Sequence, residues 1–392
     1  AQRWRAIEGL SARSWFGLGV AYFGLLLILA LGGRELFLLG LPITDDENAV
    51  RFGAQMLASG RLSVPVLQPE GAYTQIFTFT RDGMVFAMDY PGALLTQALA
   101  LVSGLGSSLY ALLAAGTGCL VVAAAGTIAG RRGALVAGVI WLCSPMARLL
   151  SMTTHNHVLS QFLIALAILM YLKIAVKGDR SFGTAAILGI AGSFAFLTRS
   201  AEAGFMLLPV VLHLVAIGYR DKALRLPLAL ASAVALLGIA FYAWYNLQTT
   251  GTLMPARFSP GIVGGTPPAG FGYGERLGRH LAHNWLIFVI MAIGPVGALL
   301  MGFAYLKRSW WLLVLSASGA ALLSLSLFHD DFGIHEVGPI HLSDLVPIAV
   351  ILTALGVTRF VPWLAKTGAD SAELAVVLLG YFVLGLGAFI LI

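Results

Sequence analysis

Residues 158–177 of the chain are VLSQFLIALAILMYLKIAVK, and this stretch indicates what kind of protein to expect. An α-helix needs about 20 predominantly apolar residues to cross the hydrocarbon core of a membrane. The stretch meets that requirement, and its only charged residues are Lys173 and Lys177 near one end. It therefore predicts a helix that spans a membrane.

The rest of the chain has the same apolar character. Of its 392 residues, 59% are hydrophobic and 11% are charged, and the mean hydropathy is +0.89. Soluble domains carry roughly 25% charged residues. We therefore expect an all-α polytopic integral membrane protein, since hydrocarbon offers the backbone no hydrogen-bond partners. The formal charge of +6 is explained by Lys and Arg in cytoplasmic loops, so nucleic acid is not an expected partner.

About 11 stretches are long and apolar enough to be transmembrane helices. They are residues 15–38, 108–130, 133–150, 158–177, 183–199, 203–219, 227–248, 285–306, 310–328, 342–362 and 371–392. No soluble domain is evident, so we expect one transmembrane domain over residues 1–392. Cys119 and Cys143 both lie in apolar runs, and two such cysteines give neither a disulfide framework nor a metal-binding spacing.

The basic residues predict the orientation of the chain. Three arginines precede the first apolar run, at Arg3, Arg5 and Arg13. Because cytoplasmic segments are enriched in Lys and Arg, the N-terminus is expected in the cytoplasm. The later basic clusters fall on the same side only if the short apolar run 91–105 does not cross. We therefore predict that 91–105 is a juxtamembrane or re-entrant helix, and that 41–107 and 249–284 are long extracytoplasmic loops.

The acidic run Thr44-Asp45-Asp46-Glu47 opens the first of these loops and has two interpretations. The structural one is a capping box, in which Thr44 accepts a hydrogen bond from the third helical amide and Glu47 reaches back. The acidic residues would then lie in the first helical turn, where the helix dipole favours them. The functional interpretation is a carboxylate that takes a proton from an acceptor hydroxyl at the membrane surface.

Further ionisable residues are expected on the same face, where ionisable groups at membrane depth are candidates for function. They are His155, His157, Arg199, Glu202, Asp330, Asp331, His335, Glu336, His341 and Asp344. Each also has a structural interpretation. Arg199 has the spacing to pair with Glu202 on a helix, and the two neighbouring histidines would not face each other on a helix as a metal pair does.

The order of several segments resembles a known family. These segments are TDDENAVRFGAQMLASGRL (44–62), MDYPGALLTQAL (88–99), SPMARLLSMTTHNHVLSQ (144–161), GSFAFLTRSAEAGFMLLP (192–209), YNLQTTGTLMP (245–255) and GPIHLSDLVP (338–347). Their order is similar to that of the membrane glycosyltransferases of the GT-C fold, which include protein O-mannosyltransferases, aminoarabinose transferases and oligosaccharyltransferase catalytic subunits.

The resemblance implies a reaction and a site. The donor would be a polyprenyl-phosphate sugar in the membrane lipid, and the acceptor a glycan, lipid or protein outside a bacterial inner membrane. Asp46 would be the catalytic base with Glu47 beside it, and arginines would hold the donor phosphate because a guanidinium binds it bidentately. The phosphate-binding candidates are Arg199, Arg257 and Arg276. The candidates for binding the acceptor or substrate are Asp45, Tyr90, His155, His157, His335, Glu336 and His341.

Two departures from the family pattern bear on activity. The second outer loop has His155 and His157 where members of the family often have an acidic residue. We therefore assign no metal ligands. The reaction could use a divalent cation as cofactor or no cofactor at all. Ile340 stands where the family's segment carries an arginine. An inactive structural subunit of a larger membrane complex is therefore one alternative, and a transporter of lipid-linked sugars is another.

Overall fold

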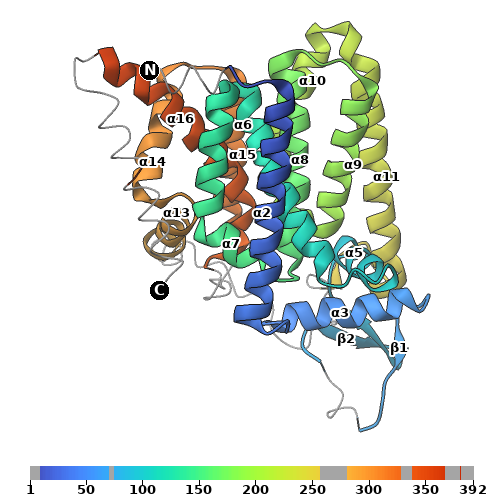
Figure 1. Cartoon of the computed structure of the whole chain (residues 1–392). Coiled ribbons are helices and arrows are strands. Elements are labelled where there is room, and N and C mark those ends of the chain that lie inside the picture. The colour runs from blue at the N-terminus through green and yellow to red at the C-terminus, as the bar shows by residue number, and fades with distance from the viewer. Residues whose placement is uncertain (1–8, 70–74, 257–279, 328–337, 367–379, 381–392) are drawn as a thin grey trace.

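Long apolar helices lie side by side through most of the chain, and a layer of shorter elements covers one end of them (Figure 1). The computed structural model describes residues 9–69, 75–256, 280–327, 338–366 and residue 380. The helices are α2 (Ala12–Leu38), α3 (Asp45–Ala58), α5 (Pro91–Val102), α6 (Ser108–Cys143), α7 (Pro145–Ser151), α8 (Asn156–Lys177), α9 (Phe182–Thr198), α10 (Ser200–Arg220), α11 (Arg225–Thr250), α13 (Leu286–Ala292), α14 (Gly294–Gly302), α15 (Trp310–Ser326) and α16 (Val346–Lys366). Shorter helical turns are η1 (Lys222–Leu224), η3 (His280–Trp285), η4 (Phe303–Leu306) and η5 (Ile340–Leu345).

The structure confirms an all-α polytopic membrane protein. Within the described ranges, 6 helices are long and apolar enough to cross a membrane, or up to 7 if the pair formed by His283–Ala292 and Gly294–Leu306 counts as one span. That pair is bent by 91° at its break. The expected count of eleven is therefore not confirmed.

Helix α6 is in fact two antiparallel arms that meet at Gly130. This glycine has φ 68° and ψ −168°, which is not helical. A Cβ added to Gly118 would lie 2.8 Å from the Trp141 ring, and one added to Gly126 would lie 3.3 Å from Ala134. In a straight helix, residues 118 and 141 would be about 35 Å apart. The two arms correspond to the expected spans 108–130 and 133–150.

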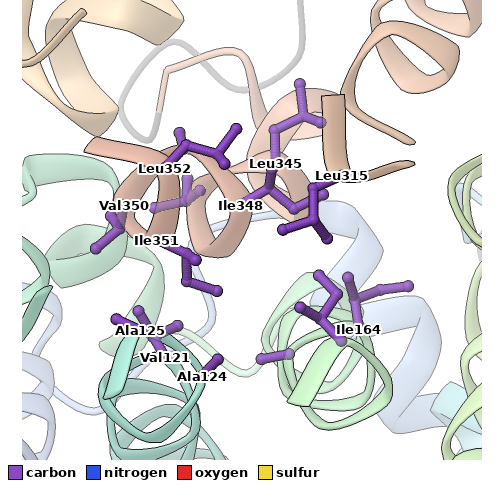
Figure 2. Close-up of a cluster of buried hydrophobic side chains, with 14 of the residues drawn as sticks. Val121, Ala124, Ala125, Ile164, Leu315, Leu345, Ile348, Val350, Ile351 and Leu352 are labelled. Atoms are coloured by element: carbon purple, nitrogen blue, oxygen red, sulfur yellow. The ribbon is translucent and has the colours of Figure 1, made fainter. Parts of the chain in front are cut away.

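The core lies where α6, α8, α15 and α16 meet. Figure 2 shows Val121, Ala124 and Ala125 of α6 facing large side chains of α16, such as Ile351. The small alanines let the two backbones approach closely. Close packing of this kind holds membrane helices together, because no hydrophobic driving force acts between helices in lipid. Helix α16 is the most enclosed of the spans, with 94% of its apolar window buried, so it forms the centre of the bundle.

A small β-sheet between α3 and α5 was not predicted from the sequence. Strands β1 (Val64–Pro65), β3 (Met84–Ala87) and β2 (Thr78–Arg81) form an antiparallel sheet in that order. Asp82 and Gly83 connect β2 to β3, both with positive φ, of 52° and 74°. An Asp-Gly pair suits this two-residue turn because it tolerates the left-handed conformation. The sheet packs beside α3 at the end of the bundle (Figure 1).

Helix α5 agrees with the prediction for residues 91–105. Its 12 residues extend about 18 Å, less than the roughly 30 Å of a hydrocarbon core. A Cβ on Gly92 would lie 2.7 Å from the Thr198 hydroxyl, so α5 packs directly on the last turn of α9. The end of α9 and the start of α3 therefore belong to the same end of the bundle, which we call the outer end.

Candidate active site

Buried polar residues from distant parts of the chain gather at the outer end. They are Glu47, Asp89, His155, His157, Ser160, Gln161, Arg199, Glu202, Asn246, Ser343 and Asp344. Three connected groups of contacts organise them. The first joins α3 to the α7–α8 connection, the second surrounds Arg199, and the third lies where β3 meets α5.

The Glu47 carboxylate fastens α3 to the bundle. One oxygen accepts a hydrogen bond from the Ile43 amide at 2.8 Å. The other accepts two from Thr154, at 2.6 Å from its amide and 2.7 Å from its hydroxyl. These contacts cross 107 residues of sequence. Glu47 is only 3% exposed, so its lone pairs serve this attachment, and its assignment to catalysis stays a prediction.

The predicted helix cap is present at Thr44. Its hydroxyl accepts a hydrogen bond from the Glu47 amide at 3.2 Å, as the capping box requires. Glu47 departs from the motif, because it reaches the amide of Ile43 in place of that of Thr44. The Thr44 hydroxyl also lies 3.0 Å from the Nε2 atom of His155, which adds a second link across the same interface.

The other two acidic residues of the run remain open to the surroundings. Asp45 is exposed and Asp46 is half-buried, both in the first turn of α3. Asp46 lies within electrostatic range of His155, as Glu47 does. The fold thus gives the acidic residues different places: Glu47 is enclosed as an anchor, and Asp46 is half-buried beside the polar centre.

His155 begins a row of three histidine rings. Its ring centroid lies 5.4 Å from that of His157, and His157 lies 6.1 Å from His341, both in edge-to-face geometry. The backbone of His155 is extended before α8 starts, so the two neighbouring rings meet although they could not do so within a helix. Nδ1 of His157 also lies 3.0 Å from the Ser343 hydroxyl.

The environment of His155 favours its neutral form. Burial lowers the pKa of His155 below its ordinary value, and the negative charges of Glu47 and Asp46 oppose that effect. No group of three or more His, Cys, Asp or Glu side chains able to hold a metal ion occurs in the described part of the chain. The arrangement can therefore accept or donate hydrogen bonds but offers no evident metal centre there.

Arg199 is held between two carboxylates. Its Nη2 donates to Glu202 at 2.6 Å, which is the pairing that the sequence spacing allowed. Its Nη1 donates to Asp344 at 2.8 Å, a contact that joins α9 to η5. The Ser160 hydroxyl donates to the same Asp344 oxygen at 2.9 Å. These two contacts use two of the five N–H donors of the guanidinium.

The Arg199 cluster is buried and acidic. Arg199 and Asp344 side chains are 4% and 0% exposed. With both carboxylates ionised, one positive charge faces two negative charges. The Oδ1 atom of Asp344 has no hydrogen-bond partner among the described residues. Such clusters are sensitive to loss of one member, because the remaining charge is left buried without compensation.

The third group contains a carboxylate that the sequence analysis missed. Asp89, between β3 and α5, is 3% exposed and lies within electrostatic range of Tyr110 and Tyr245. It lines a pocket of about 10 Å³, the size of one water molecule, together with Asn246 and Thr249. The sequence did contain a signal for Asp89, because an acidic residue stands directly before the Tyr-Pro-Gly start of an apolar helix.

Tyr90 connects this third group to the second. Its ring stacks with Tyr242 at 6.3 Å, and its hydroxyl lies within electrostatic range of Arg199. The structure thus brings together most of the predicted candidates: Asp46, Glu47, Tyr90, His155, His157, Arg199 and His341. Four others, Arg257, Arg276, His335 and Glu336, lie outside the described residues, as do Asp330 and Asp331.

Removing Arg199 should destabilise the protein. Breaking a buried pair by deleting one partner typically costs about 3–5 kcal/mol. We expect Arg199→Ala to lower the midpoint of thermal unfolding in detergent strongly. Arg199→Lys should recover only part of the loss, because Lys lacks the planar fork that reaches two carboxylates. Arg225→Ala, at an arginine that donates to the backbone carbonyls of Gly218 and Tyr219, is the control. Unchanged unfolding of Arg199→Ala would contradict a structural cluster.

His155 should make stability depend on pH. Its folded pKa lies below the unfolded value of 6.5, so the unfolded chain binds the proton first as the pH falls. The contribution of neutral His155 is therefore complete above pH 6.5 and is lost below it. We expect the difference in unfolding midpoint between wild type and His155→Gln to shrink from pH 7.5 to pH 5. His283→Gln, at an exposed histidine, is the control.

Comparison with known proteins gives structural neighbours only. Neither a protein-family model nor the sequence of a curated protein matches the chain. One neighbour is the aminoarabinose transferase ArnT from Cupriavidus metallidurans, in its structure bound to undecaprenyl phosphate. Its sequence is 17% identical to this chain, and the two structures superpose with a TM-score of 0.57. The match covers 91% of this chain and 62% of ArnT. Its apo structure gives a TM-score of 0.59 at the same identity and coverage.

An archaeal enzyme gives a similar result. The Archaeoglobus fulgidus oligosaccharyltransferase, in a complex with Zn and sulfate, is 14% identical with a TM-score of 0.57, and the match covers 94% of this chain and 52% of that one. The chain therefore spans less than two thirds of the length of each neighbour. Identities this low establish architecture and not activity. The chain has the GT-C fold, the fold of the membrane glycosyltransferases that include ArnT and the oligosaccharyltransferase.

Proposed function

We propose that the protein is a membrane glycosyltransferase that moves a sugar from a polyprenyl-phosphate donor to an acceptor hydroxyl at the outer end of the bundle. The observation that carries the proposal is the gathering of Asp46, His155, Tyr90 and Arg199 at one end of a GT-C bundle. The neighbour ArnT was crystallised with undecaprenyl phosphate, which supports a lipid phosphate as the donor's carrier. The sugar and the acceptor are left open.

The chemistry needs a base and a place for phosphate. A glycosyl phosphate already carries a good leaving group, so the protein must orient the acceptor hydroxyl, take its proton and stabilise the departing phosphate. We assign the base to Asp46, because Glu47 is occupied by three hydrogen bonds and Asp45 is the more exposed. Attack by the activated hydroxyl on the anomeric carbon from the face opposite the phosphate inverts the configuration there.

The phosphate would be bound by arginines. Arg257 and Arg276 follow α11, whose last turn lies beside the polar centre through the Tyr245 and Asn246 side chains. We propose them as the principal phosphate ligands. Arg199 would join them through its remaining N–H donors while its contact with Asp344 positions the outer ends of α9 and α16.

A structural subunit remains the second candidate. Ile340, where the family pattern has an arginine, is buried at 3% exposure and packs with Tyr110 and Leu150. An apolar contact there can hold η5 in place but cannot bind an anion. A protein that has lost catalysis while keeping the GT-C bundle would carry such a replacement.

Substitution of the acidic run separates these candidates. Asp46→Asn keeps the size of the side chain and removes its basicity, and loss of a general base typically lowers the rate by ~10²–10⁴-fold. The measurement is transfer of radiolabelled sugar from a panel of polyprenyl-phosphate sugars to membrane extracts. We expect Asp46→Asn to be nearly inactive, with an unfolding midpoint close to that of wild type, and Asp45→Asn to remain active.

Two results would reject the assignment. Near wild-type transfer by Asp46→Asn together with an inactive Asp45→Asn would move the base to Asp45. Full transfer by both single variants and the double variant would leave the acidic run as a helix cap and anchor. No transfer by wild-type protein from any donor, combined with co-purification of a stoichiometric membrane partner, would favour the structural subunit.

A further inference from the structure

A groove lies at the opposite end of the bundle, between α2 and the two arms of α6. The groove has a volume of about 740 Å³ and an almost entirely apolar lining that includes Phe16, Gly19, Tyr22, Leu135 and Val139. Lys177 lies at its edge. Helix α8 starts beside His155 and ends at Lys177, so about 33 Å separates the groove's edge from the candidate active site.

Small residues keep the groove open. A Cβ added to Gly19 would meet nothing within 4 Å, so α2 stands away from α6 at this level. The two helices meet further along α2, where the Tyr22 hydroxyl donates to the Gly138 carbonyl at 2.9 Å and Leu26 fills the space over Gly118. On the α6 side, Gly126 and other small residues form the floor.

Cationic groups border the groove where the helices end. Arg131, at the tip of the α6 hairpin, lies over the Trp15 ring at 5.7 Å and donates to the Leu10 carbonyl. Lys177 is exposed beside it in the last turn of α8. Tryptophan is typical of the level at which lipid headgroups begin, so this edge has the composition of a membrane interface.

Two acidic residues near this end have partners of their own. Asp179 accepts hydrogen bonds from Ser181 and from Thr184, the latter at 2.6 Å. Asp221 pairs with Arg180 at 2.8 Å. Arg131 and Lys177 are the two cationic residues among those that line this long apolar cavity.

We propose that this groove binds one anionic glycerophospholipid from the leaflet on its own side of the membrane. The acyl chain would lie along Phe16, Leu135 and Val139, and the phosphate would lie between Arg131 and Lys177. Basic pockets between membrane helices recognise anionic headgroups in this way. The proposal does not depend on the proposed transferase activity, because the site is at the other end of the bundle.

The test measures lipid association in reconstituted vesicles. Protein in dioleoyl phosphatidylcholine vesicles receives spin-labelled phosphatidylglycerol or spin-labelled phosphatidylcholine, and electron spin resonance gives the motionally restricted fraction of each. Wild type should prefer phosphatidylglycerol. Lys177→Gln should reduce that preference by about fivefold, which corresponds to roughly 1 kcal/mol per basic residue near a membrane surface. Gly19→Leu should fill the groove and lower the restricted fraction of phosphatidylglycerol.

Matched controls make the result specific to the groove. Gly17→Leu adds the same side chain to α2 where a Cβ also meets nothing within 4 Å, but Gly17 does not line the groove. Lys222→Gln removes one exposed charge elsewhere. Both should behave as wild type. Equal restriction of the two lipids by wild type would reject an anionic ligand, and equal effects of Gly17→Leu and Gly19→Leu would reject the groove as its site.

Discussion

Hydrocarbon gives polar groups no hydrogen-bond partners, and this constraint governs the architecture of the chain. The backbone satisfies itself in long helices, and the buried side chains of Arg199, Glu202 and Asp344 satisfy one another at the outer end. Arg199 illustrates the result, because its two carboxylate partners come from α10 and from η5. Each contact in that cluster also fixes one helix end relative to another, so charge pairing and helix arrangement are the same constraint.

The Glu47 attachment extends this logic to the outer layer. Helix α3 is short and amphipathic, and its buried apolar face packs with Ala93 and Leu94 of α5. The hydrogen bonds from Thr154 to Glu47 fix its first turn over the α7–α8 connection. The same attachment sets the position of Asp46, because Asp46 directly precedes Glu47 in the first turn of α3. An anchoring carboxylate and an accessible one are thus neighbours in the sequence with different environments.

Local patterns in the sequence were sufficient for the fold class and for part of the site. Apolar runs predicted the helices, Thr44 predicted the cap, and the spacing of Arg199 and Glu202 predicted their pairing. Asp82-Gly83 was a usable signal for the β-hairpin that went unused. The contacts of Arg199 with Asp344 and of Glu47 with Thr154 could not be predicted, because they join residues 145 and 107 positions apart. Only tertiary packing decides such partners, and the same holds for the water-sized pocket at Asp89.

The central claim is that the outer polar layer receives a lipid phosphate. The most direct measurement is a cryo-electron microscopy structure of the protein in nanodiscs with added undecaprenyl phosphate. The account predicts phosphate density at the outer end of the bundle, bordered by the start of α3, the His155 ring and the segment after α11, with the isoprenoid chain running between helices. Phosphate density at any other place, with the polar layer empty, would contradict it.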